Sequence, residues 1–121
     1  MWDLILWLYF IDAVLLIVHE IDSAYWEEWD LFRLPGGIGG FVLIHIPMVG
    51  AVLYGLLEVQ KQTQTGLVFA FVLAGVGVFA FCIHMIFIKL GRDEFKTPVS
   101  VGVLIATLLV SVGLGVVGVI S

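Results

Sequence analysis

The sequence predicts an all-α membrane protein, a four-helix transmembrane bundle with up-down topology and short loops, in a single domain of residues 1–121. Of the 121 residues, 62% are hydrophobic and only 12% are charged, whereas typical soluble domains are about half apolar and about a quarter charged. The apolar residues form four runs, each close to the length of about 20 residues that crosses a hydrocarbon core of about 30 Å. Short polar segments separate the runs, so we expect consecutive helices to be antiparallel neighbours.

The first span covers about 4–22, and the second covers about 38–57. Asp3 and Asp12 lie in or next to the first apolar run, and no basic segment precedes it. We therefore expect a retained helix there and not a cleaved signal peptide. A Pro-Gly-Gly sequence at 35–37 separates the two spans, because proline and glycine interrupt helices.

The third span covers about 67–88, and Gly91 follows it at a position typical of a helix stop. The fourth span covers about 99–120. Thr97 followed by Pro98 is typical of a helix N-terminus, with threonine as the cap and proline in the first helical position. The fourth span is also rich in glycine, which favours close helix packing and predicts a homodimer through this helix.

Charge and cysteine content exclude several classes of protein. The formal net charge is -5, which excludes a general nucleic-acid binder because such proteins need a basic face. The single cysteine excludes an internal disulfide and any CxxC metal or redox motif. The partner that the composition does predict is the lipid bilayer.

Basic residues indicate the orientation, because they favour the cytoplasmic side of a membrane. We define face A as the membrane side that holds the linkers around 23–37 and 89–98. Its basic residues are Arg33, Lys89, Arg92 and Lys96. The opposite side has only Lys61 and the N-terminus. We therefore expect an integral protein of a prokaryotic cytoplasmic membrane with face A inside and both termini outside.

The three histidines lie on three different predicted helices, as His19, His45 and His84. With a rise of about 1.5 Å per residue, His19 and His84 lie about 10 Å from the membrane centre toward face A. His45 lies a few Å from the centre on the same side. Ionisable groups inside a bilayer are costly and therefore indicate function. We expect the three imidazoles to meet in one cluster.

Three neutral imidazoles with an open fourth position form a catalytic zinc arrangement. The sequence thus predicts a site for zinc or another transition metal with His19, His45 and His84 as ligands. Asp12 differs from His19 by about 20° around the helix axis, so the two side chains share a face. A carboxylate beside a metal-bound histidine fixes its tautomer, and Asp12 is expected in this or in a proton-linked role.

Acidic and hydroxyl side chains next to His19 extend the hypothesis to catalysis. A bound metal lowers the pKa of its water to about 7, and a carboxylate can then act as general base. Glu20 or Asp22 would be that base, and Ser23 would orient the substrate. The depth of the site near face A favours a lipid-like substrate, so the sequence predicts a metal-dependent membrane hydrolase.

Three other functions stay open at this point. Two histidines on facing helices can hold haem through its axial positions, and His45 with His84 would be that pair. A small multidrug-type transporter has this size and a membrane acid in its first helix, which would be Asp12. The chain could also be an accessory subunit of a larger membrane complex.

The first half of the chain resembles small uncharacterised prokaryotic membrane proteins related to the HXXEE-motif family. The resemblance rests on His19-Glu20-Ile21-Asp22, on Tyr25, Trp26 and Trp29, on the Pro-Gly-Gly sequence at 35–37 and on His45-Ile46-Pro47. It implies four membrane helices and no known activity. The sequence departs from the motif because Asp22 and Ser23 stand where two acids are expected.

The composition of the predicted site is also similar to that of membrane hydrolases of the alkaline ceramidase and progestin-receptor type. That similarity implies three histidines, an aspartate and a serine around zinc near one membrane face. Those families have seven helices, and their histidine spacing is not reproduced here.

Overall fold

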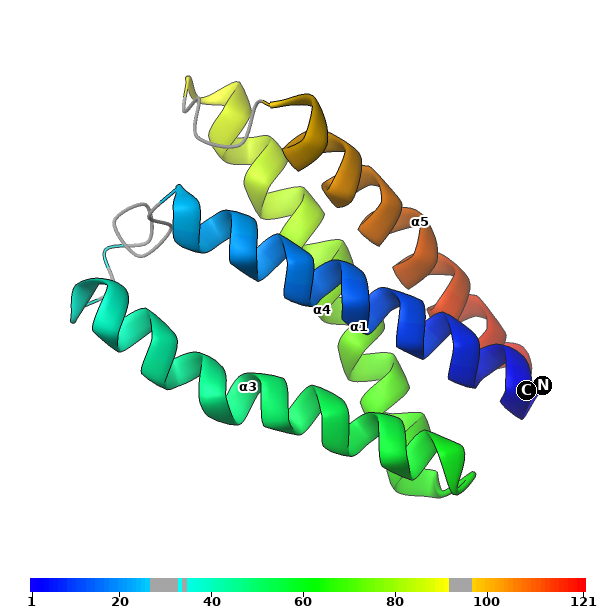
Figure 1. Ribbon diagram of the computed structural model, residues 1–121. Helices are drawn as coiled ribbons and strands as arrows, with labels where there is room; N and C mark the ends of the chain where they lie inside the picture. Colours follow the sequence, from blue (N-terminus) through cyan, green and yellow to red (C-terminus); the bar gives the residue numbers. More distant parts are fainter. Residues whose placement is uncertain (27–32, 34, 92–96) are drawn as a thin grey trace.

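The computed structural model describes residues 1–26, 33, 35–91 and 97–121 and confirms the all-α fold (Figure 1). The helices are α1 (Trp2–Tyr25), α3 (Gly37–Gln60), α4 (Gln64–Lys89) and α5 (Pro98–Ile120). Each of these four helices is long and apolar enough to cross a membrane, which is compatible with the expected location in a bilayer. Trp29, which contributes to the resemblance, lies outside the described residues, as do Arg92 and Lys96, which indicate the orientation.

The helix ends follow the local signals of the sequence. Thr97 Oγ1 accepts a hydrogen bond from the backbone N of Ser100 at 3.2 Å, and Pro98 is the first residue of α5. Gly36 and Gly91 have φ angles of 95° and 94°, a conformation that glycine adopts without steric cost. The boundaries predicted for α3, α4 and α5 thus have the expected chemical cause.

The helices form a compact trio with a fourth helix at its edge. α5 contacts α1 and α4, whereas α3 contacts α1 and α4 and has no contact with α5 among the described residues. Figure 1 shows α3 beside α1, on the side away from α5. The buried residues of α3 are Phe41, Gly55, Glu58 and Val59. Three of these four lie in its last six residues, so the C-terminal end of α3 is the better anchored part.

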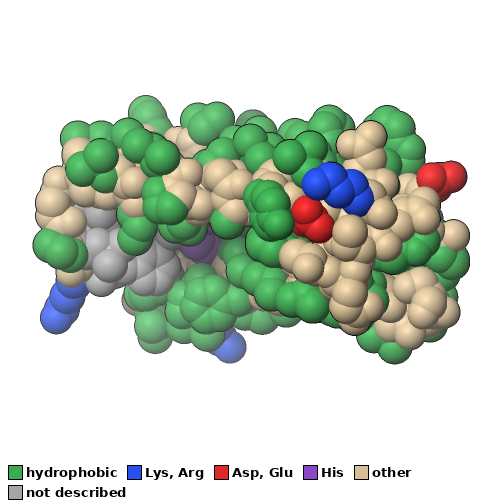
Figure 2. All heavy atoms as spheres, turned by 90° about the horizontal axis from the view of Figure 1, so that it is seen from below, with side chains coloured by type: hydrophobic (Ala, Val, Ile, Leu, Met, Phe, Trp, Pro, Cys, Tyr) green, Lys and Arg blue, Asp and Glu red, His purple; other side chains and the backbone are tan. Residues whose placement is uncertain are grey.

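Most of the apolar core lies in the half of the bundle opposite face A. Its buried members are Ile5, Tyr9, Ala13, Leu16, Val59, Ala70, Leu73, Ala74 and Leu114. Figure 2 shows one outer face, on which hydrophobic side chains cover most of the surface and charged side chains are few. An apolar exterior of this kind is what a bilayer stabilises, because lipid tails solvate it without cost.

Candidate functional site

Polar side chains occupy the interior of the bundle beyond the apolar core. On α1, Asp12, His19 and Ser23 are separated by seven and four residues, so they lie along one face of the helix. All three are buried, with exposed fractions of 0%, 2% and 0%. Asp12 has a neighbour on α5, and His19 has one on α4.

Asp12 is joined to α5. Ser111 Oγ lies 2.9 Å from each carboxylate oxygen of Asp12 and shares its hydrogen with them. Thr107, one turn earlier on α5, is also buried and donates to the carbonyl oxygen of Val103 at 2.7 Å. A Cβ atom at Gly77 of α4 would lie 1.8 Å from Ser111 Oγ. The absence of a side chain at Gly77 therefore lets α4 pass beside the Asp12–Ser111 pair.

His19 and His84 meet nearer to face A. Their ring centroids are 4.6 Å apart with the rings perpendicular, and each side chain is 2% exposed. His84 Nδ1 lies 2.7 Å from the carbonyl oxygen of Ala80 and donates to it. The structure therefore brings together two of the three histidines that the sequence places in the face A half of the membrane.

His45 has a different partner. Its Nε2 atom lies 2.5 Å from Oε2 of Glu20 on α1. Its Nδ1 atom lies 2.6 Å from the carbonyl oxygen of Phe41, and the Phe41 ring packs on the imidazole with centroids 4.0 Å apart. The side chains of His45 and Glu20 are 16% and 28% exposed. The pair thus lies at the boundary between the bundle interior and its surface.

The Glu20–His45 contact must contain a proton. A carbonyl oxygen only accepts hydrogen bonds, so Nδ1 of His45 carries a hydrogen that points to Phe41. A neutral imidazole with this tautomer has an acceptor at Nε2, and a carboxylate is also only an acceptor. Two acceptors would repel at 2.5 Å. A hydrogen therefore lies between the two atoms, and Glu20 and His45 form a hydrogen bond that joins α1 to α3.

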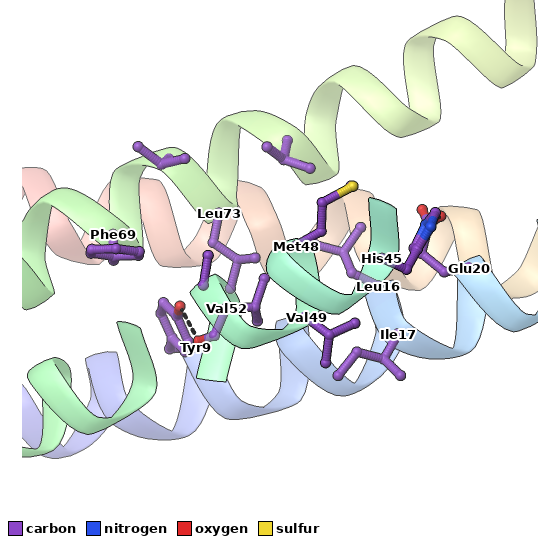
Figure 3. Close-up of a pocket in the computed structure, with 13 residues that line it drawn as sticks. Tyr9, Leu16, Ile17, Glu20, His45, Met48, Val49, Val52, Phe69 and Leu73 are labelled. Atoms are coloured by element: carbon purple, nitrogen blue, oxygen red, sulfur yellow. Dashed lines mark hydrogen bonds and ion pairs between the residues drawn. The ribbon is translucent and has the colours of Figure 1, made fainter. Parts of the chain in front are cut away.

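This pair closes one end of a cavity between α1, α3 and α4 (Figure 3). The cavity has a volume of about 280 Å³. Its walls are formed by Tyr9, Leu16, Ile17, Glu20, His45, Met48, Val49, Ala51, Val52, Phe69, Val72, Leu73 and Val76. Figure 3 shows Glu20 and His45 close together at one end and Tyr9 further along, where its hydroxyl donates to the Val52 carbonyl oxygen at 2.7 Å. The cavity is therefore apolar along its length and polar at one end.

The predicted catalytic residues do not gather in this cavity. Glu20 lines it, whereas Asp22 accepts a hydrogen bond from Trp26 Nε1 at 3.1 Å. Ser23 is fully buried, and its hydroxyl has no hydrogen-bond partner within the part of the chain that the structure describes. Of the three predicted catalytic residues, the structure thus places Glu20 alone in the cavity wall.

Two of the three predicted metal ligands contact each other, and the third contacts Glu20. Across residues 1–26, 33, 35–91 and 97–121, no group of three or more His, Cys, Asp or Glu side chains could hold a metal ion. His19 packs against His84, and His45 turns to Glu20. His45 and His84, the predicted haem pair, have different contact partners in the described residues, Glu20 and His19. Asp12, expected beside a histidine, has Ser111 as its partner.

Sequence reasoning missed the polar residues of α5. Ser100, Thr107 and Ser111 are all buried, with exposed fractions of 2%, 0% and 0%. Their spacing of seven and four residues places them on one helical face. That periodicity was the available signal, because hydroxyl residues on one face of an apolar helix bond to neighbouring helices.

The chain belongs to a family of unknown function, DUF6713, whose model matches residues 5–120. No curated protein matches the chain significantly, and no solved structure does. The family match neither supports nor contradicts the resemblance to the HXXEE-motif family, which stays a prediction.

Proposed function

We propose that this member of the DUF6713 family is an integral membrane protein that binds a single-chain amphiphile between α1, α3 and α4. One observation supports the proposal above all: a cavity with apolar walls has the Glu20–His45 pair at one end. Pockets for small ligands usually measure about 300–1,000 Å³. The volume of about 280 Å³ suits one alkyl chain better than a complete two-chain lipid.

The polar end favours a particular head group. Both ring nitrogens of His45 are engaged, one by Phe41 and the other by Glu20. At this end of the cavity, the lone pairs that remain for a ligand are those of the Glu20 carboxyl group, which can accept further hydrogen bonds. The ligand should therefore donate, so its head group is a hydroxyl or an ammonium group. An anionic head group would meet only acceptors.

Entry from the bilayer is consistent with the position of α3. Met48 lines the cavity and is 47% exposed, so this wall borders the surroundings of the bundle. Methionine side chains adapt their shape easily, which would let an alkyl chain pass. The amphiphile would thus enter sideways from the membrane and would not cross the tightly packed trio of α1, α4 and α5.

Photo-crosslinking in lipid nanodiscs tests the proposal. The probes are three alkyl chains of equal length with a diazirine, carrying a hydroxyl, an ammonium or a carboxylate head group. We expect the first two to crosslink to cavity residues and the carboxylate to crosslink at least about tenfold less, as the loss of a charge-assisted hydrogen bond would give. Val49→Trp should block labelling by filling the cavity. Val42→Trp is the matched control, because Val42 lies on the same helix, is 53% exposed and is not part of the cavity wall.

Glu20→Gln separates the two head groups. The amide keeps an acceptor oxygen for a hydroxyl probe, but it cannot become a carboxylate, which is the stronger acceptor for an ammonium probe. Labelling by the ammonium probe should fall more than labelling by the hydroxyl probe. Equal labelling of Val49→Trp and the parent protein, or crosslinks spread over all helices, would exclude the cavity as a binding site.

The functions predicted from sequence that the cavity does not support stay predictions. A zinc-dependent hydrolase needs the metal and catalytic residues to converge, and a haem site needs two facing imidazoles. Asp12 does not line the cavity, so a multidrug-type transporter that binds its substrate at Asp12 would need another arrangement. A pull-down from membranes tests the prediction that the chain is an accessory subunit of a larger complex. A protease-protection assay tests the predicted orientation with both termini outside.

A homodimer through the glycine-rich helix α5 also stays a prediction. Gly118 is used within the chain, since a Cβ atom there would lie 3.0 Å from the Phe71 ring of α4. Gly102 and Gly113 have nothing within 4 Å of such an atom and are the glycines left for a second copy. Disulfide crosslinking of cysteines placed at these two positions tests the dimer.

A further inference from the structure

A second polar feature lies in the interior of α1, α4 and α5, apart from the amphiphile cavity. We define the interior column as Asp12, His19, Ser23, His84, Ser100, Thr107 and Ser111, which are each at most 2% exposed. The column is internal because Ser111 contacts Asp12, His84 contacts His19, and α5 contacts only α1 and α4 among the described helices. None of its members lines the cavity.

The members of the column are spread evenly over the face A half of the membrane. Measured along each helix from its end at face A, Ser23 and Ser100 lie about 3 Å deep, His19 and His84 about 8 to 9 Å, Thr107 about 14 Å, and Asp12 and Ser111 about 20 Å. Successive levels are thus about 5 or 6 Å apart along the helix axes, close to the length of two hydrogen bonds through one water molecule. Polar groups therefore lead from face A to the middle of the membrane.

The column ends at Asp12. On the other side of this level, the buried residues Ile5 of α1, Leu73 of α4 and Leu114 of α5 are apolar. Tyr9 lies one turn from Asp12 on that side, and its hydroxyl donates to the carbonyl oxygen of Val52 on α3. The polar route is consequently one-sided, with Asp12 at its inner end.

The buried hydroxyl of Ser23 is a second, independent indication that water enters the interior column. Its hydroxyl is fully buried at the outer level of the column and has no hydrogen-bond partner among residues 1–26, 33, 35–91 and 97–121. Buried hydroxyl groups are almost always hydrogen-bonded, commonly to water. A water molecule at this level would complete the bonding of Ser23 and begin the route inward.

The charges around Asp12 leave its carboxyl group without a cationic partner in the described structure. α5 has no ionisable side chain, and the ionisable residues of α4 are Cys82, His84 and Lys89, all toward face A. α3 contributes His45, Tyr54 and Glu58, of which His45 is paired with Glu20 and Glu58 with Lys61 and Thr63 at the far end. On α1 itself Tyr9 is one turn away. An ionised carboxylate in a membrane interior is costly without a counter-charge, and a bound proton removes that cost.

We propose that Asp12 is a proton-binding site at the middle of the membrane, which exchanges protons with face A through the interior column. The carboxylate takes up one proton to become the neutral acid and returns the proton by the same route. Ser111 stays hydrogen-bonded in both states, because a hydroxyl can donate to the carboxylate and accept from the acid. This site goes beyond amphiphile binding and does not depend on the cavity.

Infrared difference spectroscopy of the full chain in lipid bilayers tests the site. After a rapid drop in pH, the carbonyl stretching band of a protonated carboxyl group should appear and should vanish when the pH is restored. Asp12→Asn keeps the shape of the side chain and should lack this band.

Thr107→Val tests the route, because it keeps the shape of the residue at the middle level of the column but removes its hydroxyl. We expect proton uptake at Asp12 to become about tenfold slower, the order expected from one lost hydrogen bond, without a change in the pH midpoint.

Thr65→Val is the matched control, because Thr65 is exposed on α4 and lies outside the column. It should leave the rate unchanged. Identical band changes in the parent protein and Asp12→Asn would overturn the proton site. Equal uptake rates in Thr107→Val and Thr65→Val would overturn the route.

A chemical measurement covers the case in which Asp12→Asn does not fold. A membrane-soluble carbodiimide reacts with protonated carboxyl groups, and mass spectrometry locates the adduct in the parent protein. Labelling of Asp12 should fall as pH rises. The absence of Asp12 labelling at every pH would count against the proposal, whatever happens at the amphiphile cavity.

Discussion

Glu20 of α1 and His45 of α3 lie 2.5 Å apart between Oε2 and Nε2, and the proton between them joins two helices at the open edge of the bundle. The C-terminal end of α3 is anchored by the buried residues Gly55, Glu58 and Val59. Its N-terminal part has Phe41 as its buried residue, and Phe41 packs on His45. The Glu20–His45 pair therefore holds the less anchored part of α3 against α1 at one end of the cavity.

A double-mutant cycle measures the strength of this pair. We expect Glu20→Gln and His45→Asn to be coupled by about 1 to 3 kcal/mol in the free energy of unfolding, because a hydrogen bond to a charged group contributes this much. The measurement is reversible unfolding of the single and double variants in detergent micelles. Additive effects within about 0.5 kcal/mol would show that the contact does not stabilise the protein.

Ser111→Ala should destabilise the bundle. Its hydroxyl contacts both carboxylate oxygens of the fully buried Asp12. Removal leaves a buried polar group without its partner, which costs about 1 to 3 kcal/mol. Ser121→Ala is the control, because Ser121 is exposed at the C-terminal end of α5, and it should change the free energy of unfolding by no more than about 0.5 kcal/mol. Both values come from thermal or denaturant unfolding followed by circular dichroism. Equal effects of the two substitutions would contradict the assigned role of Ser111.

Two glycines on α4 offer a matched pair. A Cβ atom at Gly77 would lie 1.8 Å from Ser111 Oγ, whereas one at Gly75 would meet nothing within 4 Å. Gly77→Ala should therefore force α4 and α5 apart and cost about 1 to 3 kcal/mol. Gly75→Ala should be neutral or stabilise by up to about 1 kcal/mol, because alanine favours the helix over glycine. The comparison uses the midpoint of thermal unfolding of each variant. A similar loss at both positions would mean that the close approach at Gly77 is not required.

The four helices could be predicted because each depends on its own stretch of sequence. A run of apolar residues long enough to cross a bilayer needs no partner to be recognised. The caps at Thr97 and the breaks at Gly36 and Gly91 are equally local. Depth was also predictable, since the rise per residue places His19 and His84 at similar heights, and their rings are in contact.

Rotation of each helix about its axis could not be predicted in the same way. The height of His45 does not determine which way its ring points, and the ring turns to Glu20 of the neighbouring α1. Glu20 follows His19 directly in the sequence, so a turn of about 100° around α1 separates the two faces. This difference of one residue on α1 decides whether the His45 ring contacts the two other imidazoles or the carboxyl group of Glu20. Ser111 was missed for a similar reason, because a serine in an apolar helix reveals its role only when its partner helix is known.

Metal removal separates the zinc prediction from amphiphile binding. The Glu20–His45 contact is completed by protein atoms and a proton, so it needs no ion to hold its geometry. We expect crosslinking by the hydroxyl probe to be unchanged after treatment of the protein with a strong chelator. The control is elemental analysis before and after treatment. A catalytic zinc site would give about one equivalent of metal per chain. His19→Ala and His84→Ala should leave crosslinking unchanged as well, since neither residue lines the cavity. If chelation removed a bound metal and also abolished crosslinking, and if either histidine substitution abolished crosslinking as well, the cavity would depend on a metal centre. The histidine cluster predicted from sequence would then form in a state other than this one.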